Sequence, residues 1–156
     1  MLLLALCGVL LWQSLRVEDP EIVVAGESIS VDGFKLTEAR LDSDTSYRLY
    51  WIGPSSKDVI ASIRAPALVL NPPRSSGLTG FTALAEGEST INGQRYTVFV
   101  DQLDLGYWSA EGRRIPEKTV FGLEGAQVAD LNGGRTRLVA LYIVGPPHPG
   151  AAGRTT

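Results

Sequence analysis

The sequence predicts an all-β domain with at most one short helix, built as a β-sandwich or partly open barrel and preceded by an N-terminal hydrophobic helix. Three observations support this. The 17 Gly and 9 Pro among 156 residues would interrupt long helices. Runs of β-branched and aromatic residues alternate with Gly, Asn, Asp and Pro, as in short strands joined by turns. Residues 137–144 are, after Arg137, apolar at odd and even positions alike, which predicts a central strand covered on both faces.

Three segments are expected along the chain. Residues 1–16 are predicted to be a membrane anchor or signal segment, residues 17–145 the β-domain, and residues 146–156 a flexible tail rich in Pro and Gly. A helix from Leu2 to Trp12 would span about 17 Å, whereas a membrane core is about 30 Å thick. The run therefore fits a signal-anchor whose true start lies upstream, a signal peptide without its basic region, or an interfacial helix of a soluble protein.

The first half of the domain is predicted to consist of strands and tight turns. Asp32-Gly33 is a strong signal for a two-residue hairpin, and residues 42–44 form the next turn. Residues 57–64 fit either a short helix capped by Ser55 or Ser56, which is slightly preferred, or a strand. The strands expected here are residues 22–24, 28–31, 34–41, 47–52 and 67–70.

The second half follows the same pattern. Residues 74–80 are expected to be a mobile loop, Asn92-Gly93 a second hairpin, and residues 106–114 part of a long loop. Side chains of a strand alternate between faces, so Thr97, Phe99 and Asp101 should share one face of theirs. The strands expected here are residues 81–86, 95–103, 119–121, 126–129 and 137–144.

Scarce residue types exclude several classes of function. With one Cys (Cys7) and one His (His148), the chain can form neither an internal disulfide nor a Cys/His zinc site. His148 lies in a Pro-rich stretch that is poorly suited to hold a catalytic base. The net charge of −3 provides no basic field for nucleic acid. We therefore expect no metal, no cofactor and no nucleic-acid partner.

The predicted binding residues are Tyr107, Trp108, Arg113 and Arg114. Tyr, Trp and Arg are the residue types most enriched at binding hot spots. These four lie in the segment of residues 106–114, which contains Gly106 and Gly112 and lies between predicted strands, where recognition residues on β-scaffolds commonly occur. The alternative is that Trp108 folds back over the core.

Two pairs of residues suggest catalysis only weakly. Ser56 and Lys57 would suit a Ser/Lys hydrolase, but adjacent residues do not face each other on a helix or strand. Asp101 and Asp104 could form a carboxylate pair, yet three-residue spacing in a strand places them on opposite faces. Solvated positions at a turn or rim explain these carboxylates better.

The sequence thus favours a non-enzymatic, membrane-anchored protein whose extracytoplasmic domain acts as a binding or accessory subunit of an envelope assembly. The acidic residues after the apolar run (Glu18, Asp19, Glu21) are compatible with a periplasmic or extracellular body. Its expected partners are other membrane or envelope proteins, and the membrane itself through the N-terminal segment. The alternatives are a small His-independent hydrolase and a secreted β-sandwich that binds a ligand or carbohydrate.

Overall fold

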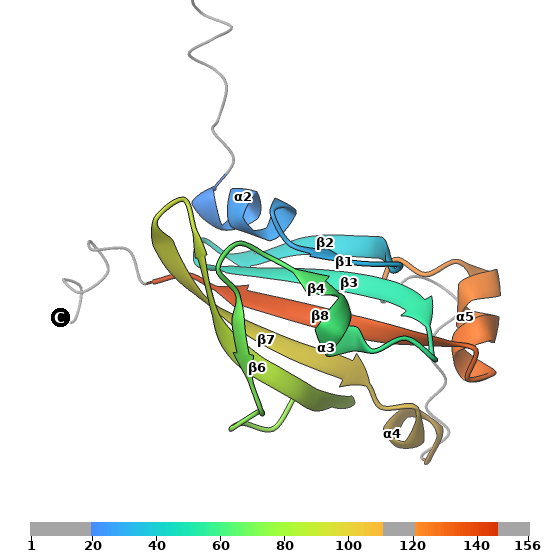
Figure 1. Cartoon of the computed structure of the whole chain (residues 1–156). Coiled ribbons are helices and arrows are strands. Elements are labelled where there is room, and N and C mark those ends of the chain that lie inside the picture. The colour runs from blue at the N-terminus through green and yellow to red at the C-terminus, as the bar shows by residue number, and fades with distance from the viewer. Residues whose placement is uncertain (1–19, 111–120, 147–156) are drawn as a thin grey trace, which may run out of the picture.

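The structure is a computed structural model that describes residues 20–110 and 121–146. This part of the chain is mostly β, as predicted, and forms two open antiparallel sheets of two and six strands (Figure 1). The predicted N-terminal helix, residues 147–156 of the tail, Arg113 and Arg114 lie outside the described residues. In order, the elements are α2 (Glu21–Glu27), β1 (Ser30–Val31), β2 (Lys35–Ser43), β3 (Ser46–Pro54), α3 (Val59–Ser62), β4 (Ile63–Arg64), β5 (Val69–Asn71), β6 (Phe81–Ile91), β7 (Gln94–Leu103), α4 (Leu105–Ala110), α5 (Gly125–Asn132) and β8 (Thr136–Val144).

The large sheet has the strand order β2-β3-β8-β7-β6-β5. The last strand, β8, therefore lies between β3 and β7. Val139 and Leu141 are fully buried on one face of β8, and Leu138 is fully buried on the other. The prediction that residues 137–144 form a central strand is confirmed.

The two predicted hairpins had different outcomes. Asn92 and Gly93 have φ angles of 52° and 80° and join β6 to β7, so this hairpin is confirmed. Asp32-Gly33 forms a turn, in which the Phe34 amide donates to the Val31 carbonyl at 3.0 Å. The predicted hairpin is nevertheless wrong, because β1 pairs with β4 while β2 pairs with β3. This turn carries the chain from one sheet to the other.

The prediction of at most one short helix is wrong, since the described residues contain four. Residues 22–24, expected as a strand, belong to α2, where Ile22 and Ala25 face the core at helical spacing. Residues 126–129 belong to α5, and a capping box formed by Glu124 and Gln127 marks the start of this helix. Residues 106–110 form most of α4 rather than a loop. Residues 57–64 divide into a helical turn, capped by Asp58 instead of Ser55 or Ser56, and the strand β4.

Each face of the large sheet contributes to its own hydrophobic core. On the first face, side chains such as Val98, Val100 and Leu141 pack with α2, α3 and the small sheet. On the second face, Leu103, Leu138 and Ala140 pack with α5, Phe121 and Leu123, and Trp108 of α4 joins them at the edge. In Figure 1, α4 and α5 lie at the same end of the large sheet. None of the helices among the described residues has the length and apolar character needed to cross a membrane.

Candidate functional site

The half of the second face that is farther from α4 and α5 carries a row of side chains running across all six strands. Residues directly opposite each other in antiparallel strands point to the same side of the sheet, and the strand register therefore aligns one residue from each strand. The members are only half-buried or exposed, unlike the core positions on the same strands. We call this set the cross-strand row: Arg40, Arg48, Tyr142, Phe99, Glu86 and Asn71, from β2 to β5.

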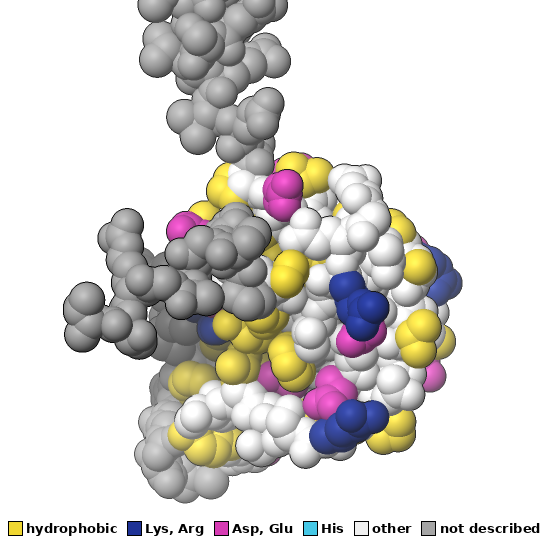
Figure 2. Space-filling view, turned by 90° about the vertical axis from the view of Figure 1, so that its left-hand side faces the viewer, with side chains coloured by type: hydrophobic (Ala, Val, Ile, Leu, Met, Phe, Trp, Pro, Cys, Tyr) yellow, Lys and Arg dark blue, Asp and Glu magenta, His cyan; other side chains and the backbone are white. Residues whose placement is uncertain are grey.

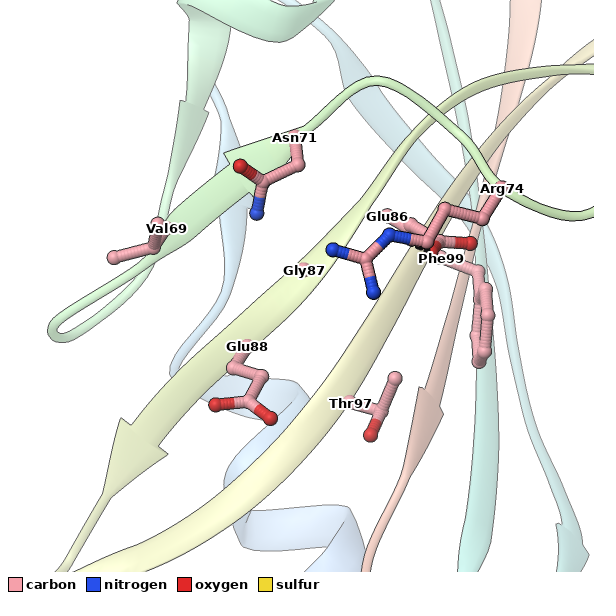
Figure 3. A pocket seen from close by; sticks show the side chains of 8 residues that line it. All are labelled: Val69, Asn71, Arg74, Glu86, Gly87, Glu88, Thr97 and Phe99. Carbon is pink, nitrogen blue, oxygen red and sulfur yellow. Dashed lines mark ion pairs between the residues drawn. The ribbon is translucent and has the colours of Figure 1, made fainter.

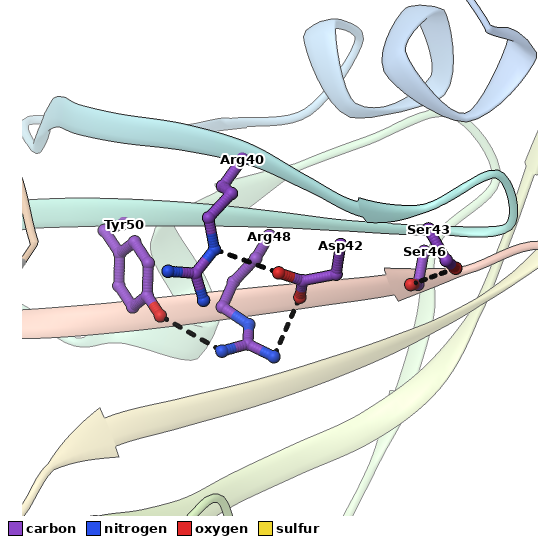
Figure 4. A network of polar contacts seen from close by, with 6 residues as sticks. All are labelled: Arg40, Asp42, Ser43, Ser46, Arg48 and Tyr50. Carbon is purple, nitrogen blue, oxygen red and sulfur yellow. Dashed lines mark hydrogen bonds and ion pairs between the residues drawn. The ribbon is translucent and has the colours of Figure 1, made fainter.

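One end of the cross-strand row is a network of charges around Asp42 (Figure 4). Arg40 and Arg48 face each other across β2 and β3, an arrangement that would be repulsive by itself. Asp42 removes this repulsion by pairing with the Arg40 Nε at 2.9 Å and the Arg48 Nη2 at 2.8 Å. The Arg48 Nη1 also donates to the Tyr50 hydroxyl at 3.3 Å. The network holds Arg48 in one orientation on the sheet surface.

The centre of the row is aromatic. The Arg48 guanidinium carbon lies 5.1 Å from the centroid of the Tyr142 ring, within cation–π range. Tyr142 in turn packs beside Phe99, with ring centroids 6.1 Å apart. Burial by itself would lower the pKa of Arg48, but the bond to Tyr50 and nearby charges including Asp42 outweigh it and raise that pKa. Arg48 is therefore a cation at neutral pH.

A groove of about 320 Å³ lies at the other end of the row, which we call the edge groove (Figure 3). Asn71, Glu88 and Thr97 line it together with Glu86 and Phe99. Arg74 extends over the groove from the segment after β5, with its Nε 3.7 Å from the Glu86 carboxylate and its side chain 84% exposed. Because this ion pair is long and exposed, it holds Arg74 only weakly.

A second hollow of about 190 Å³ adjoins the edge groove and shares Glu86 and Phe99 with it. We call it the loop pocket, because the segment of residues 73–78 forms one side and Asp101 and Tyr142 line the sheet side. Asp101 is only 5% exposed, and its Oδ2 accepts a hydrogen bond from the Leu78 amide at 3.0 Å. The expectation that Asp101 is a solvated rim residue is therefore wrong; it fastens the loop to β7.

The predicted binding residues that the structure describes lie apart from the cross-strand row. Trp108 packs against the second core, with its ring centroid 6.3 Å from that of Phe121, and its Nε1 donates to the Gly80 carbonyl at 3.0 Å. Tyr107 packs edge-on against Trp108 at a centroid distance of 6.0 Å. Trp108 thus has a structural role, whereas the contact role of Tyr107, Trp108, Arg113 and Arg114 stays a prediction.

The residues considered for catalysis are not assembled into a catalytic group. Ser56 and Lys57 are exposed in the segment before α3. Asp104 caps α4, where its Oδ1 accepts from the Tyr107 amide at 3.1 Å, while Asp101 is used at the loop. Among residues 20–110 and 121–146, no three His, Cys, Asp or Glu side chains gather as metal ligands would.

Sequence reasoning missed the cross-strand row, although part of the signal was visible. The alternation of β7 correctly places Thr97, Phe99 and Asp101 on one face. Nothing local in the sequence relates Arg48 to Tyr142, because only the pairing of β3 with β8 brings them together.

In the space-filling view of Figure 2, basic and acidic side chains lie next to one another, so among the described residues on that face neither sign of charge dominates.

No family model matches this chain, and neither a curated protein nor a solved structure does. Its function must therefore be argued from the geometry of the site.

Proposed function

We propose that the protein is a non-enzymatic binding protein, anchored to a membrane by residues 1–16, whose extracytoplasmic β-domain contacts other membrane or envelope proteins. The observation that carries this proposal is the cross-strand row. On the inner strands β3, β8 and β7, helices and the small sheet cover most apolar side chains away from the row, while the row exposes aligned aromatic and charged groups. A contact surface of this composition suits a protein partner, since Tyr and Arg dominate interface energetics.

The row has the properties expected of a preorganised contact surface. The ion pairs with Asp42 orient Arg40 and Arg48, and Tyr142 packs between Arg48 and Phe99. Side chains that are already ordered lose less rotamer entropy when a partner binds.

The small sheet packs over the first face as a second layer, which supports a sandwich-like interpretation of the domain.

Membrane attachment is a separate part of the proposal and is supported by the apolar run from Leu2 to Trp12. Fractionation of cells expressing the full chain or a chain lacking residues 1–16 tests it. We expect the full chain in the membrane fraction and the shortened chain in the soluble fraction. Recovery of the full chain as a stable soluble monomer would overturn the anchor, but would leave the contact surface untouched.

Affinity capture from native membranes tests the contact surface. The variants are Tyr142→Ala and Arg48→Ala, and the matched control is Arg64→Ala, which removes an exposed arginine paired with Asp32 outside the large sheet. We expect a protein captured by the wild type and the control to be lost with both row variants while their melting temperatures stay close to that of the wild type. Capture that is equal for all four proteins would overturn the proposal.

The secreted carbohydrate-binding alternative is favoured by one observation. In the edge groove, Arg74 and Glu86 lie beside the Phe99 ring, and Asn71 lines the same groove from β5; all three polar side chains have planar ends. An aromatic ring can stack on a sugar, and polar neighbours of this kind can form hydrogen bonds with the hydroxyl groups of the sugar. Binding of a soluble oligosaccharide that is lost with Phe99→Ala, together with release of the mature chain from the membrane, would favour this alternative.

A further inference from the structure

The loop pocket contains a buried carboxylate whose hydrogen-bonding capacity is only partly used. A carboxylate can accept about four hydrogen bonds. Asp101 accepts one, from the Leu78 amide to Oδ2, and no described residue donates to Oδ1. A carboxylate in a residue that is only 5% exposed normally has a counter-charge or several hydrogen-bond donors. Two arginines contact the lining of the pocket, Arg48 at Tyr142 and Arg74 at Glu86, and their ion pairs are with Asp42 and Glu86 rather than with Asp101.

A second carboxylate and two aromatic rings complete the pocket. Glu86 lines it and is held by the Ser75 hydroxyl at 3.3 Å and by the weak contact with Arg74. The rings of Phe99 and Tyr142 stand beside these carboxylates. Aromatic rings attract cations through their electron-rich faces, and most strongly where water is excluded. Two acids and two rings around one small cavity are therefore complementary to an organic cation.

The molecule's own arginines show that this region attracts guanidinium groups. Arg48 lies over Tyr142 from the β3 side, and Arg74 reaches Glu86 from the loop side. The two are held very differently. Arg48 has a 2.8 Å ion pair and a bond to Tyr50, whereas Arg74 has a single 3.7 Å ion pair and an 84% exposed side chain. Arg74 is thus a cation that an incoming group could displace.

We propose that the loop pocket binds an ammonium or guanidinium group, with Asp101 and Glu86 as its counter-charges, Phe99 and Tyr142 as its aromatic walls, and Arg74 as an internal competitor. The cation is either the side chain of a Lys or Arg on a bound protein or a free small organic cation. Only the first source rests on the proposed function above; the chemistry of the pocket is the same for both.

Nuclear magnetic resonance titration of the full chain in detergent tests this proposal, with the backbone amides of Leu78 and Phe99 as reporters. The probes are n-butylammonium, N-ethylguanidinium and the neutral n-butanol, followed by capped Gly-Lys-Gly and Gly-Gln-Gly. We expect saturable shifts with the cations and the lysine peptide, at millimolar dissociation constants. Saturation by the peptide without saturation by the free cations would assign the site to a protein side chain, and saturation by both would show that a free cation suffices.

Three variants should change the affinity for the cation, two of them downward and one upward. Glu86→Gln and Asp101→Asn should weaken cation binding by about tenfold, because each removes a charge while retaining an oxygen acceptor. Arg74→Gln should strengthen it several-fold by removing the competitor. Glu27→Gln, which removes an exposed charge from α2 on the other side of the large sheet, is the control and should leave the affinity within twofold. If Asp101→Asn unfolds the loop, Glu86→Gln and Arg74→Gln still decide the matter.

Equal shifts with n-butanol would overturn the proposal, as would the absence of saturation in both the wild type and Arg74→Gln. An unchanged affinity in Glu86→Gln would also overturn it. Cation binding without capture of any protein would contradict the proposed contact function but support the pocket, and capture without cation binding would do the reverse.

Discussion

The two faces of the large sheet differ in how completely they are covered. On the first face, α2, α3 and the small sheet cover the strands, and buried aliphatic side chains form the larger core. On the second face, α5 and the segment around Phe121 cover one end only. The cross-strand row occupies the remainder, where arginine, tyrosine and carboxylate side chains replace aliphatic ones. The covered parts of both faces therefore supply stability, and we expect the open half of the second face to be the part of the sheet that contacts a ligand.

The largest loss of stability is expected from substitutions on β8, where successive side chains point to different faces of the sheet. Leu141→Asp should cost about 4 kcal/mol or more in the free energy of unfolding, because it buries an unpaired charge in the first core. Tyr142→Asp should cost only about 1 kcal/mol, since Tyr142 is half-buried beside Arg48. Urea denaturation of both variants measures the difference. A cost below about 1 kcal/mol for Leu141→Asp would contradict the burial of β8 in the first core.

The covered end of the second face depends on Trp108. Trp108→Ala should lower the free energy of unfolding by about 2–3 kcal/mol, because it empties part of the second core and leaves the Gly80 carbonyl without its indole donor. Trp108→Phe, the control, should lose about 1 kcal/mol, the value of the hydrogen bond. Thermal unfolding monitored by circular dichroism checks both. Unchanged stability in Trp108→Ala would move this residue from the core to the predicted contact surface.

A substitution at the β5–β6 edge of the large sheet is expected to have a local effect on stability. A Cβ on Gly87 would overlap the Val69 carbonyl, so Gly87→Ala must displace β5 from β6. The expected cost is about 1–2 kcal/mol. Hydrogen exchange should then show lost protection at residues 69–71 with β8 unaffected. Gly125→Ala is the matched control, because nothing lies within 4 Å of its added Cβ, and its stability should change by less than about 1 kcal/mol.

The smallest expected effect distinguishes the faces by pH. Burial on the first face, with a further contribution from Glu21, raises the pKa of Tyr96. The unfolded chain therefore releases this proton at lower pH than the folded chain. The resulting stabilisation is fully present below about pH 10 and is lost as the pH rises through the folded-state pKa. Comparison of urea midpoints between pH 8 and 11 should show a steeper decline for the wild type than for Tyr96→Phe, and parallel declines would refute this assignment.

Local patterns were sufficient for some elements because the required information lies within a few residues. Asn-Gly at residues 92–93 accepts the positive φ angles of a tight hairpin, whatever surrounds it. The apolar residues after Arg137 indicate a central strand, but the cover on both faces that they also predict is complete only around Leu138 and Ala140, since Tyr142 lies on the open half of the second face. The same kind of pattern failed at residues 22–24 and 126–129. Short apolar runs fit both a strand and a helix, and burial of Ile22, Ala25, Val128 and Leu131 at helical spacing decided for helix.

In the candidate site, too, the sequence indicates local features but not how distant strands pair. The residue types of the row were visible in the sequence, and so was the shared face of Thr97, Phe99 and Asp101. The sequence by itself determined the mostly β character, the central last strand and the β6–β7 hairpin, because strand propensity, period-two burial and turn geometry are local properties. Only the tertiary structure decided that Arg48, Tyr142, Phe99 and Glu86 form one row and that Asp101 holds the loop. Strand order and register are set by packing between segments distant in the chain, and a shift of one residue in any one strand would turn that strand's member of the row to the other face.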